Sequence, residues 1–546
     1  MNEDLPTKFP RRIASFGDVH CAVNYDFSNL SMVRVAGGYV AIDAGSHPSI
    51  SCEVVANWKQ IAAGPLLAMI YTHSHTDHIG GADAFAMDDV PVWSHERFMD
   101  ELTEPMLLPN AYFARSAKQF GSCLEKREVD SNGIGRPLRL DIGAVPRIRI
   151  PNHTFREQTE LAFGGTTFVL RSGPGETTDH LFAWLPDQRV LFAGDNLYKA
   201  FPNLYSIRGV PPRPIRGWID TLDQMRRLQP RPEVMILGHT EPVVGSQNIH
   251  DLLTLYRDAI AFVHDSVVRG INAGRTPDQL AREIRLPESL AEHPYLQEQY
   301  GTVAGSIRGI YGGYIGWFDG DAANLDPVAD DDIAGWIVGE LGGRGEVKSR
   351  IELATQNGDL KQAVWLCRML QVDSPNWHDG KLAKAQVLEI MAANAKNPLS
   401  RSWLASEAAL LRNRRSFPAK PKIDGGTVCE LPVEQMLRLL PSRLNPKTSA
   451  TLTTAIGFDL TDTRQGFTLF IRNGVGELAP GLNAEASLVI RASEPDMKRI
   501  FLIREVTPIR SEFWKRLHFD VPEAGVLTPF RKLLRLARMR RLFLLV

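Results

Sequence analysis

Short apolar stretches separated by polar turns run through residues 1 to about 248. Residues 32–35 and 39–42 flank Gly37-Gly38, a pattern that predicts a β-hairpin. A buried strand is expected at 67–71, and further strands are expected at 168–170, 190–193 and 234–237. This alternation of short strands with intervening helical segments predicts a layered α/β domain.

From about 249 the apolar spacing becomes helical. Leu252, Tyr256, Ile260 and Val263 recur on one helical face, and residues 347–415 resemble packed helical hairpins. A proline-rich break at 417–422 predicts a linker. Strand-like alternation returns at 467–472, before a turn at Asn473-Gly474, and again at 488–490, which indicates an α+β region. The basic and apolar end, 530–546, is expected to be a helix packed on its own domain.

The charge balance excludes recruitment by a global electrostatic field. The 546 residues include 62 basic and 63 acidic ones, so we expect no nucleic-acid partner. No run approaches the roughly 20 apolar residues that a membrane span needs, so we also expect no stable membrane insertion. The five cysteines are scattered, which argues against a disulfide framework and against a thiolate zinc site. The N-terminus shows no secretory pattern. We therefore expect a cytoplasmic protein, or a periplasmic or secreted one if an export signal is missing from this sequence.

Four potential metal ligands fall within six residues directly after the predicted strand 67–71. His73 and His75 are two positions apart, so they face the same side of an extended segment, and Asp77 and His78 follow. Zinc chemistry requires nitrogen and oxygen ligands that converge from a rigid frame, with one position left for water or substrate. The run predicts a metal-dependent hydrolase with two zinc ions per chain.

Polar residues also follow other predicted strands. Gly194-Asp195 follows 190–193, and Gly238-His239 follows 234–237, where active sites of layered α/β folds usually lie. Asp43 ends the strand 39–42 and is expected to orient a metal ligand.

The pattern H-x-H-x-D-H after a strand resembles the signature of the metallo-β-lactamase fold. This resemblance implies an αββα sandwich in which His73 and His75 hold one zinc ion and the pair Asp77 and His78 holds the second. It also implies three further ligands at later strand ends: Glu176, a bridging Asp195 and His239.

Within that fold the chain is similar to the alkyl sulfatases. They carry Glu where most members carry His, as at Glu176, and their stretch N-L-Y-T-L-R-G resembles 203–209. The resemblance implies that Asn203 and Arg208 contact a sulfate group, which a guanidinium fork and an amide donor suit. Tyr205 is left open between a catalytic contact and a core aromatic residue. The chain departs from the family where Asp195 replaces Glu.

A second departure concerns the group that protonates the leaving oxygen. Tyr198-Lys199 stands where a Thr-His pair is common. Lys199, Tyr198 and His180 are therefore all candidates for this acid, and the alternative for each is a supporting or structural role.

The resemblance continues towards the C-terminus. Residues 300–303, 308–320 and 324–327 resemble the helical dimerisation domain of alkyl sulfatases, which implies a homodimer. The last part resembles their sterol-carrier-protein-like domain, either a tunnel for an alkyl tail or a structural cap. The expected fold class is multidomain α/β and α+β. It comprises an αββα sandwich (1–248), an α-helical dimerisation domain (249–415) and an α+β sterol-carrier-like domain (425–546).

The family likeness implies zinc-dependent hydrolysis of alkyl sulfate esters to an alcohol and inorganic sulfate by a metal-activated water. The expected substrate is a small anionic ester with an apolar tail. Attack at sulfur and attack at carbon both stay open. The alternatives are another hydrolase of the superfamily, such as a phosphodiesterase or lactonase, and a non-catalytic lipid-binding protein.

Overall fold

The computed structural model describes residues 9–62, 64–85, 89–138, 146–418, 430–502 and 518–520. These form two compact units. The first comprises the described residues of 1–98, 114–143 and 153–419, and the second comprises those of 99–113, 144–152 and 420–546. None of the described helices is long and apolar enough to span a membrane.

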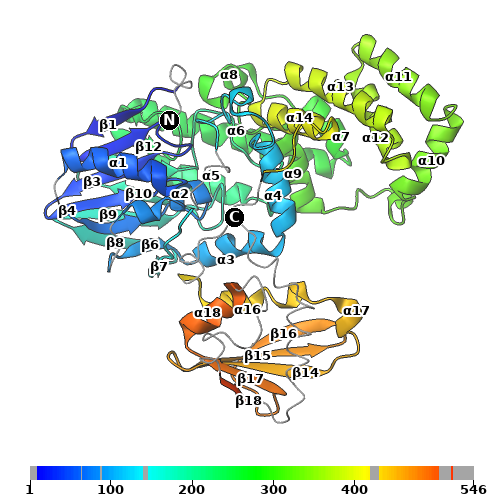
Figure 1. The fold of residues 1–546 in the computed structure, drawn as a ribbon. Helices are drawn as coiled ribbons and strands as arrows, with labels where there is room; N and C mark the ends of the chain where they lie inside the picture. The colour runs from blue at the N-terminus through cyan, green and yellow to red at the C-terminus, as the bar shows by residue number, and fades with distance from the viewer. Residues whose placement is uncertain are drawn as a thin grey trace. The chain divides into compact units, whose positions relative to one another are not determined.

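The first unit contains two β-sheets that pack against each other (Figure 1). One has the order β1-β2-β3-β4-β5-β6-β7 and the other the order β13-β12-β11-β10-β9-β8. The first sheet contains β1 Arg12–Phe16, β2 Val19–Val23, β3 Leu30–Val35, β4 Gly38–Ile42, β5 Leu66–Ile70, β6 Val92–His95 and β7 His153–Phe155. The second contains β8 Gln158–Phe163, β9 Thr166–Ser172, β10 Leu181–Leu185, β11 Val190–Gly194, β12 Val234–Leu237 and β13 Val243–Val244. The strands predicted from the sequence are all present.

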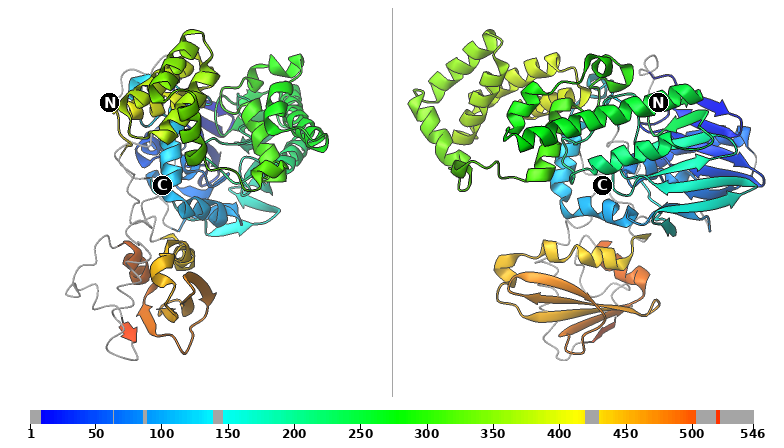
Figure 2. Two further views of the ribbon diagram at one scale, coloured as in Figure 1. Left: turned by 90° about the vertical axis from the view of Figure 1, so that its right-hand side faces the viewer. Right: turned by 180° about the vertical axis from the view of Figure 1, so that it is seen from behind.

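Alternating residues of these strands serve two different cores. Val40 and Ile42 of β4 pack with Phe192 of β11 between the sheets. The preceding Tyr39 faces the opposite side, where its ring lies 6.4 Å from that of Trp58 in α1 (Pro48–Ile61). Leu191 likewise faces away from Phe192 and packs with α5 (Ile215–Arg226) and α6 (Ser246–Asn272). A helical layer therefore covers each sheet, as Figure 2 also shows, and the predicted αββα sandwich is confirmed.

Short helices lie between the strands along the chain. They are α2 Thr76–Ile79, η1 Ala82–Ala84, α3 Phe98–Thr103, η2 Glu104–Leu107, α4 Pro109–Gln119 and η3 Lys126–Glu128.

The helical region begins with α6 and continues as antiparallel helices. Its further members are α7 Pro277–Glu283, α8 Glu288–Ala291, η4 Pro294–Leu296, α9 Val303–Ile315, η5 Ala322–Asn324, α10 Asp330–Glu340, α11 Arg344–Gln356, α12 Leu360–Asp373, α13 His378–Asn394 and α14 Pro398–Leu411. Gly358 separates α11 from α12 with φ = 82°, a conformation that favours glycine, which agrees with the predicted hairpin turn. The boundaries at 248 and 415 stay predictions.

The second unit contains a sheet of the order β16-β15-β14-β17-β18. Its elements are α16 Val433–Arg438, η6 Pro441–Arg443, α17 Pro446–Ser449, β14 Thr454–Leu460, β15 Gln465–Arg472, β16 Val475–Pro480, β17 Leu488–Ala492, α18 Glu494–Leu502 and β18 His518–Asp520. Asn473 and Gly474 both have positive φ, as the two-residue hairpin turn between β15 and β16 requires. Most of the predicted linker and the whole predicted helix at 530–546 lie outside the described residues.

Candidate metal centre

The histidine run starts where β5 ends. The short segment after β5 leads into α2, whose first turn carries Asp77 and His78. His73 is fully buried, and its Nε2 lies 2.9 Å from Nδ1 of His75. Two ring nitrogens at this separation, each with a lone pair available, suit a shared cation.

Two neighbouring strands of the other sheet bring two further predicted ligands. β11 and β12 are parallel, so their carboxyl ends meet at one edge of the sheet. Asp195 and His239 follow these ends, and the Oδ2 atom of Asp195 lies 3.1 Å from Nε2 of His239. A Cβ atom at Gly238 would lie 2.0 Å from Oδ1 of Asp195, so only glycine permits this close approach.

Six predicted ligands thus form two groups, each with ligand atoms within 4.8 Å of one another. The groups are His73 with His75 and Asp195, and Asp77 with His78 and His239. Nε2 of His78 and Oδ1 of Asp195 are buried and lie 3.3 Å from each other, and neither forms a well-aligned hydrogen bond within the described structure. Buried polar atoms normally have partners, so these atoms indicate a site completed by a ligand. A set of histidines and carboxylates fits zinc.

Contacts behind the ligands fix the orientation of two imidazole rings. Nδ1 of His78 lies 2.7 Å from Oδ2 of Asp43, which also accepts a hydrogen bond from the Thr72 hydroxyl. Nδ1 of His239 lies 2.7 Å from the carbonyl oxygen of Phe27. With the Nδ1 protons directed at these acceptors, both Nε2 atoms face the centre. The position expected for Asp43 is confirmed.

Electrostatics separate two kinds of histidine. Burial lowers the pKa of His73 and His75 well below the usual value, and the charges of His78 and Arg208 lower these values further, so both rings are neutral. Burial would also lower the pKa of His239, but Asp195 outweighs it and raises the value to about 10. Without metal, protons balance the carboxylates; a divalent cation would replace them.

Glu176 lies outside both groups. Its Oε1 forms an ion pair with Arg213 at 2.9 Å, and the two side chains are only 1% and 3% exposed. Its Oε2 is buried without a hydrogen-bond partner in the described part of the chain. Glu176 therefore has one oxygen that remains available, and its role as a metal ligand stays a prediction. The sequence analysis did not predict the ion-pair partner of Glu176, Arg213. Its only signal in the sequence was a charged residue inside a proline-rich run.

Arg208 and Asn203 differ in how closely they approach the centre. Arg208 is half-buried, and its guanidinium lies 3.2 Å from Nε2 of His75. Asn203 is buried, and its Nδ2 has no hydrogen-bond partner among the described residues. Its backbone N–H donates to the Tyr198 hydroxyl at 2.8 Å. A guanidinium beside His75 and an unpaired amide donor suit a tetrahedral anion.

The three candidate acids are Lys199, which is exposed, and Tyr198 and His180, which are buried. Lys199 is exposed, with its ammonium group 5.9 Å from the centre of the Tyr295 ring. Burial raises the pKa of Tyr198 well above its usual value, so it is a neutral phenol. Nε2 of His180 accepts from the backbone N–H of Asp195 at 2.9 Å, and burial lowers the pKa of His180 to about 3. His180 therefore holds the backbone of Asp195 in place.

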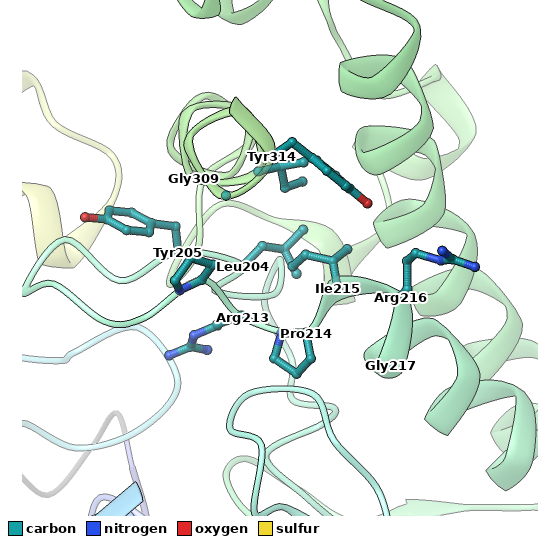
Figure 3. Close-up of a pocket in the computed structure, with 12 residues that line it drawn as sticks. Leu204, Tyr205, Arg213, Pro214, Ile215, Arg216, Gly217, Gly309 and Tyr314 are labelled. Carbon is teal, nitrogen blue, oxygen red and sulfur yellow. The ribbon is translucent and has the colours of Figure 1, made fainter. Parts of the chain in front are cut away.

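Tyr205 belongs to the segment 204–217 and packs against α9. A Cβ atom at Gly309 would lie 2.4 Å from Cβ of Tyr205, so this glycine permits the packing. Leu204, Ile215 and Tyr314 help to line a cavity of about 310 Å³ on this side (Figure 3). In Figure 3, Tyr205 and Arg213 point to one side and Tyr314 to the other. The catalytic roles of Tyr205 and Lys199 stay predictions.

Two family models match the chain. The model described as metallo-beta-lactamase superfamily matches residues 23–239, and the model described as alkyl sulfatase dimerisation matches residues 276–414. A linear primary-alkylsulfatase of Pseudomonas sp. (strain ATCC 19151) is 33% identical over 84% of this chain and 89% of its own length. An (R)-specific secondary-alkylsulfatase of Pseudomonas sp. is 26% identical over 87% of this chain and 74% of its own length.

A solved structure has the same fold. The stereoselective inverting sec-alkylsulfatase from Pseudomonas sp. superimposes with a TM-score of 0.88, covering 95% of this chain and 84% of that one, at 24% sequence identity. The match includes the sandwich, the helical region and the second unit, and it confirms the predicted architecture.

Proposed function

The chain belongs to the alkylsulfatase family of the metallo-β-lactamase superfamily, and on this premise we propose that it hydrolyses alkyl sulfate esters to an alcohol and inorganic sulfate. The observation that supports this most directly is the Arg208 guanidinium, which lies 3.2 Å from the predicted ligand His75, together with a buried Asn203 amide whose Nδ2 has no hydrogen-bond partner among the described residues. The Arg208 guanidinium and the Asn203 amide would hold the sulfate oxygens next to His75. Such fixed donors stabilise an anion better than water does, because they need no reorganisation.

Two zinc ions per chain are the proposed cofactors. One would be held by His73, His75 and Asp195, and the other by Asp77, His78 and His239. Glu176 would join through its unpaired Oε2. Zinc bound there would supply a Lewis acid and a water of lowered pKa. The protein's own residues orient the ester: Arg208 and Asn203 bind it, and the buried walls around His73 exclude bulk water.

A homodimer is the proposed assembly. The end of α9, the segment after it and α10 together expose large apolar side chains: Tyr314, Ile315, Trp317, Leu325, Val328 and Trp336. We call these six residues the apolar segment. Trp317 is 77% exposed and Trp336 64%. Large exposed apolar patches mark interaction surfaces, and this one lies within the region matched by the dimerisation model.

The expected substrate is an anionic ester with an apolar tail. Whether the second unit binds that tail or only stabilises the protein stays a prediction, and so does a cytoplasmic location. The sequence alternative of a phosphodiesterase or lactonase gains no specific support from the site.

A turnover screen of zinc-loaded protein tests the proposal. The panel comprises decyl sulfate, a chiral secondary sulfate, a phosphodiester and an acyl lactone. We expect the sulfate esters alone to be hydrolysed, and the configuration of the secondary alcohol to report which bond breaks: inversion for attack at carbon, retention for attack at sulfur. Faster turnover of the phosphodiester or the lactone would overturn the assignment.

The variant Arg208→Ala supplies the residue-level test. Loss of a hydrogen bond to a charged group costs about 1.5–3 kcal/mol, so KM for decyl sulfate should rise roughly ten- to hundredfold. Metal content should stay unchanged. Loss of zinc in this variant would make Arg208 a structural residue of the centre.

A further inference from the structure

Two side chains of α4 hold the backbone that carries Arg208. Arg115 donates from Nε to the carbonyl oxygen of Arg208 at 2.6 Å, and from a terminal nitrogen to that of Ile207 at 2.7 Å. Oε1 of Gln119 accepts from the backbone N–H of Arg208 at 2.8 Å and from the Ser206 hydroxyl at 3.1 Å. Arg208 is therefore fixed through both of its own peptide groups.

The Gln119 amide has only one orientation that serves this role. The backbone N–H of Arg208 is a donor, so the amide oxygen of Gln119 must face it. Gln119 is fully buried, and its Nε2 has no hydrogen-bond partner among the described residues. The side chain thus leaves its own donor unsatisfied while it holds the segment 206–208.

The Arg115 guanidinium is in turn held by α14. It lies over the ring of Trp403, 5.3 Å from the ring centre, and the ammonium group of Lys118 lies 5.6 Å from the same ring. Lys118 also pairs with Glu407 of α14 at 3.2 Å. Stacking on the aromatic ring restricts the orientation of the guanidinium, so its two donors stay directed at the carbonyl oxygens.

We infer that Arg115 and Gln119 are positioning residues that aim the Arg208 side chain at the sulfate group, and that Trp403 fixes Arg115 for this task. This rests on the proposed function, in which Arg208 binds the sulfate. The Arg208 guanidinium reaches the centre from a loop of the segment 206–209, where Gly209 has φ = 95°. A loop of this kind does not hold a long side chain without outside support, and a misplacement of about 1 Å can reduce a rate by about a hundredfold.

A different role for Arg115 is direct attraction of the anionic ester, since its side chain is exposed. The two roles predict different couplings with Arg208. A residue that acts only through Arg208 has no effect once the Arg208 side chain is removed, whereas an independent contact still contributes.

A double-mutant cycle on the zinc-loaded full chain tests the inference. The variants are Arg115→Met, Arg208→Ala and the two combined, with Arg115→Lys, Gln119→Met and Trp403→Leu as additional variants. Arg285→Met is the matched control, because exposed Arg285 also donates to two carbonyl oxygens, those of Ala281 and Ile284, at the end of α7. The measurements are kcat and KM for decyl sulfate, the calorimetric Kd for inorganic sulfate, zinc content and thermal stability.

We expect Arg115→Met and Gln119→Met to raise KM and the sulfate Kd about tenfold with zinc content unchanged. Arg115→Lys keeps the charge but lacks the forked guanidinium, so its KM and Kd should lie between those of the wild type and those of Arg115→Met. In the Arg208→Ala background, Arg115→Met should change neither value further. An equal loss in both backgrounds, or an equal loss in Arg285→Met, would overturn the inference. If wild-type protein bound no sulfate and hydrolysed no sulfate ester, the proposed function would fail instead. If Arg208→Ala raised KM and the sulfate Kd but Arg115→Met did not, the inference would be wrong and the proposed function would stand.

Discussion

Glu176 and Arg213 form a buried ion pair at 2.9 Å. Glu176 lies in the loop between β9 and β10, and Arg213 lies in the proline-rich run before α5. Burial raises the pKa of Glu176, whereas the positive charge of Arg213 opposes that rise. The pair orients one carboxylate oxygen at the guanidinium and leaves the other without a hydrogen-bond partner among the described residues. If Glu176 binds a metal ion as predicted, Arg213 leaves one of its two oxygens for that role.

Removal of Arg213 should destabilise the protein strongly. Arg213→Met leaves the Glu176 carboxylate buried without its partner, which typically costs 3–5 kcal/mol, so a loss of about that size is expected in urea unfolding with chelator present. Arg11→Met breaks the exposed pair with Glu53 and should cost about 1 kcal/mol or less. The double variant Arg213→Met with Glu176→Gln should recover part of the loss. An Arg213→Met protein as stable as Arg11→Met would contradict the importance of the buried pair.

Removal of metal should abolish turnover reversibly. The six grouped ligands converge on buried sites, so chelator treatment should remove the metal and the hydrolysis of decyl sulfate together, and added zinc should restore both. Elemental analysis of the restored protein should give two zinc ions per chain. Full turnover by protein shown to be free of metal would exclude the metal-dependent mechanism.

The apolar segment should control assembly. Trp317→Asp combined with Trp336→Asp places two charges on an apolar surface, and sedimentation analysis should then show monomers at concentrations where the wild type is dimeric. Val475→Asp, which changes a 57% exposed residue of β16 in the second unit, is the control and should leave the dimer intact. A dimer that survives both tryptophan changes would locate the interface elsewhere.

The contact of α4 with α14 should depend on pH through Glu407. Burial alone would raise the pKa of Glu407, but the hydrogen bond and charge of Lys384, together with Lys118, hold it below the usual value. A lowered folded-state pKa adds stability above the unfolded value of about 4.3, and that stability is lost as pH falls through the folded pKa. Glu407→Gln should therefore cost about 2 kcal/mol at pH 7, and the difference from wild type should shrink towards pH 3 in urea unfolding. A difference independent of pH would rule out the charge as its cause.

Local sequence was sufficient for the first half of the site. His73, His75, Asp77 and His78 lie within six residues after a strand, so the chain itself brings their side chains together. Apolar runs that end in a glycine and a polar residue also located the candidate ligands after β11 and β12, because parallel neighbouring strands end at the same edge of a sheet. Periodicity alone distinguished the strand region from the helices that follow it.

Tertiary structure decided what surrounds that centre. Arg213 meets Glu176, and Arg115 meets the carbonyl oxygen of Arg208, across long stretches of chain. No spacing or periodicity encodes such contacts, because irregular loops carry one partner of each pair and their path depends on the packing of α4, α9 and α14. The sequence by itself determined which residues can hold the metals; only the folded loops determined which side chains orient Arg208 and which charge neutralises Glu176.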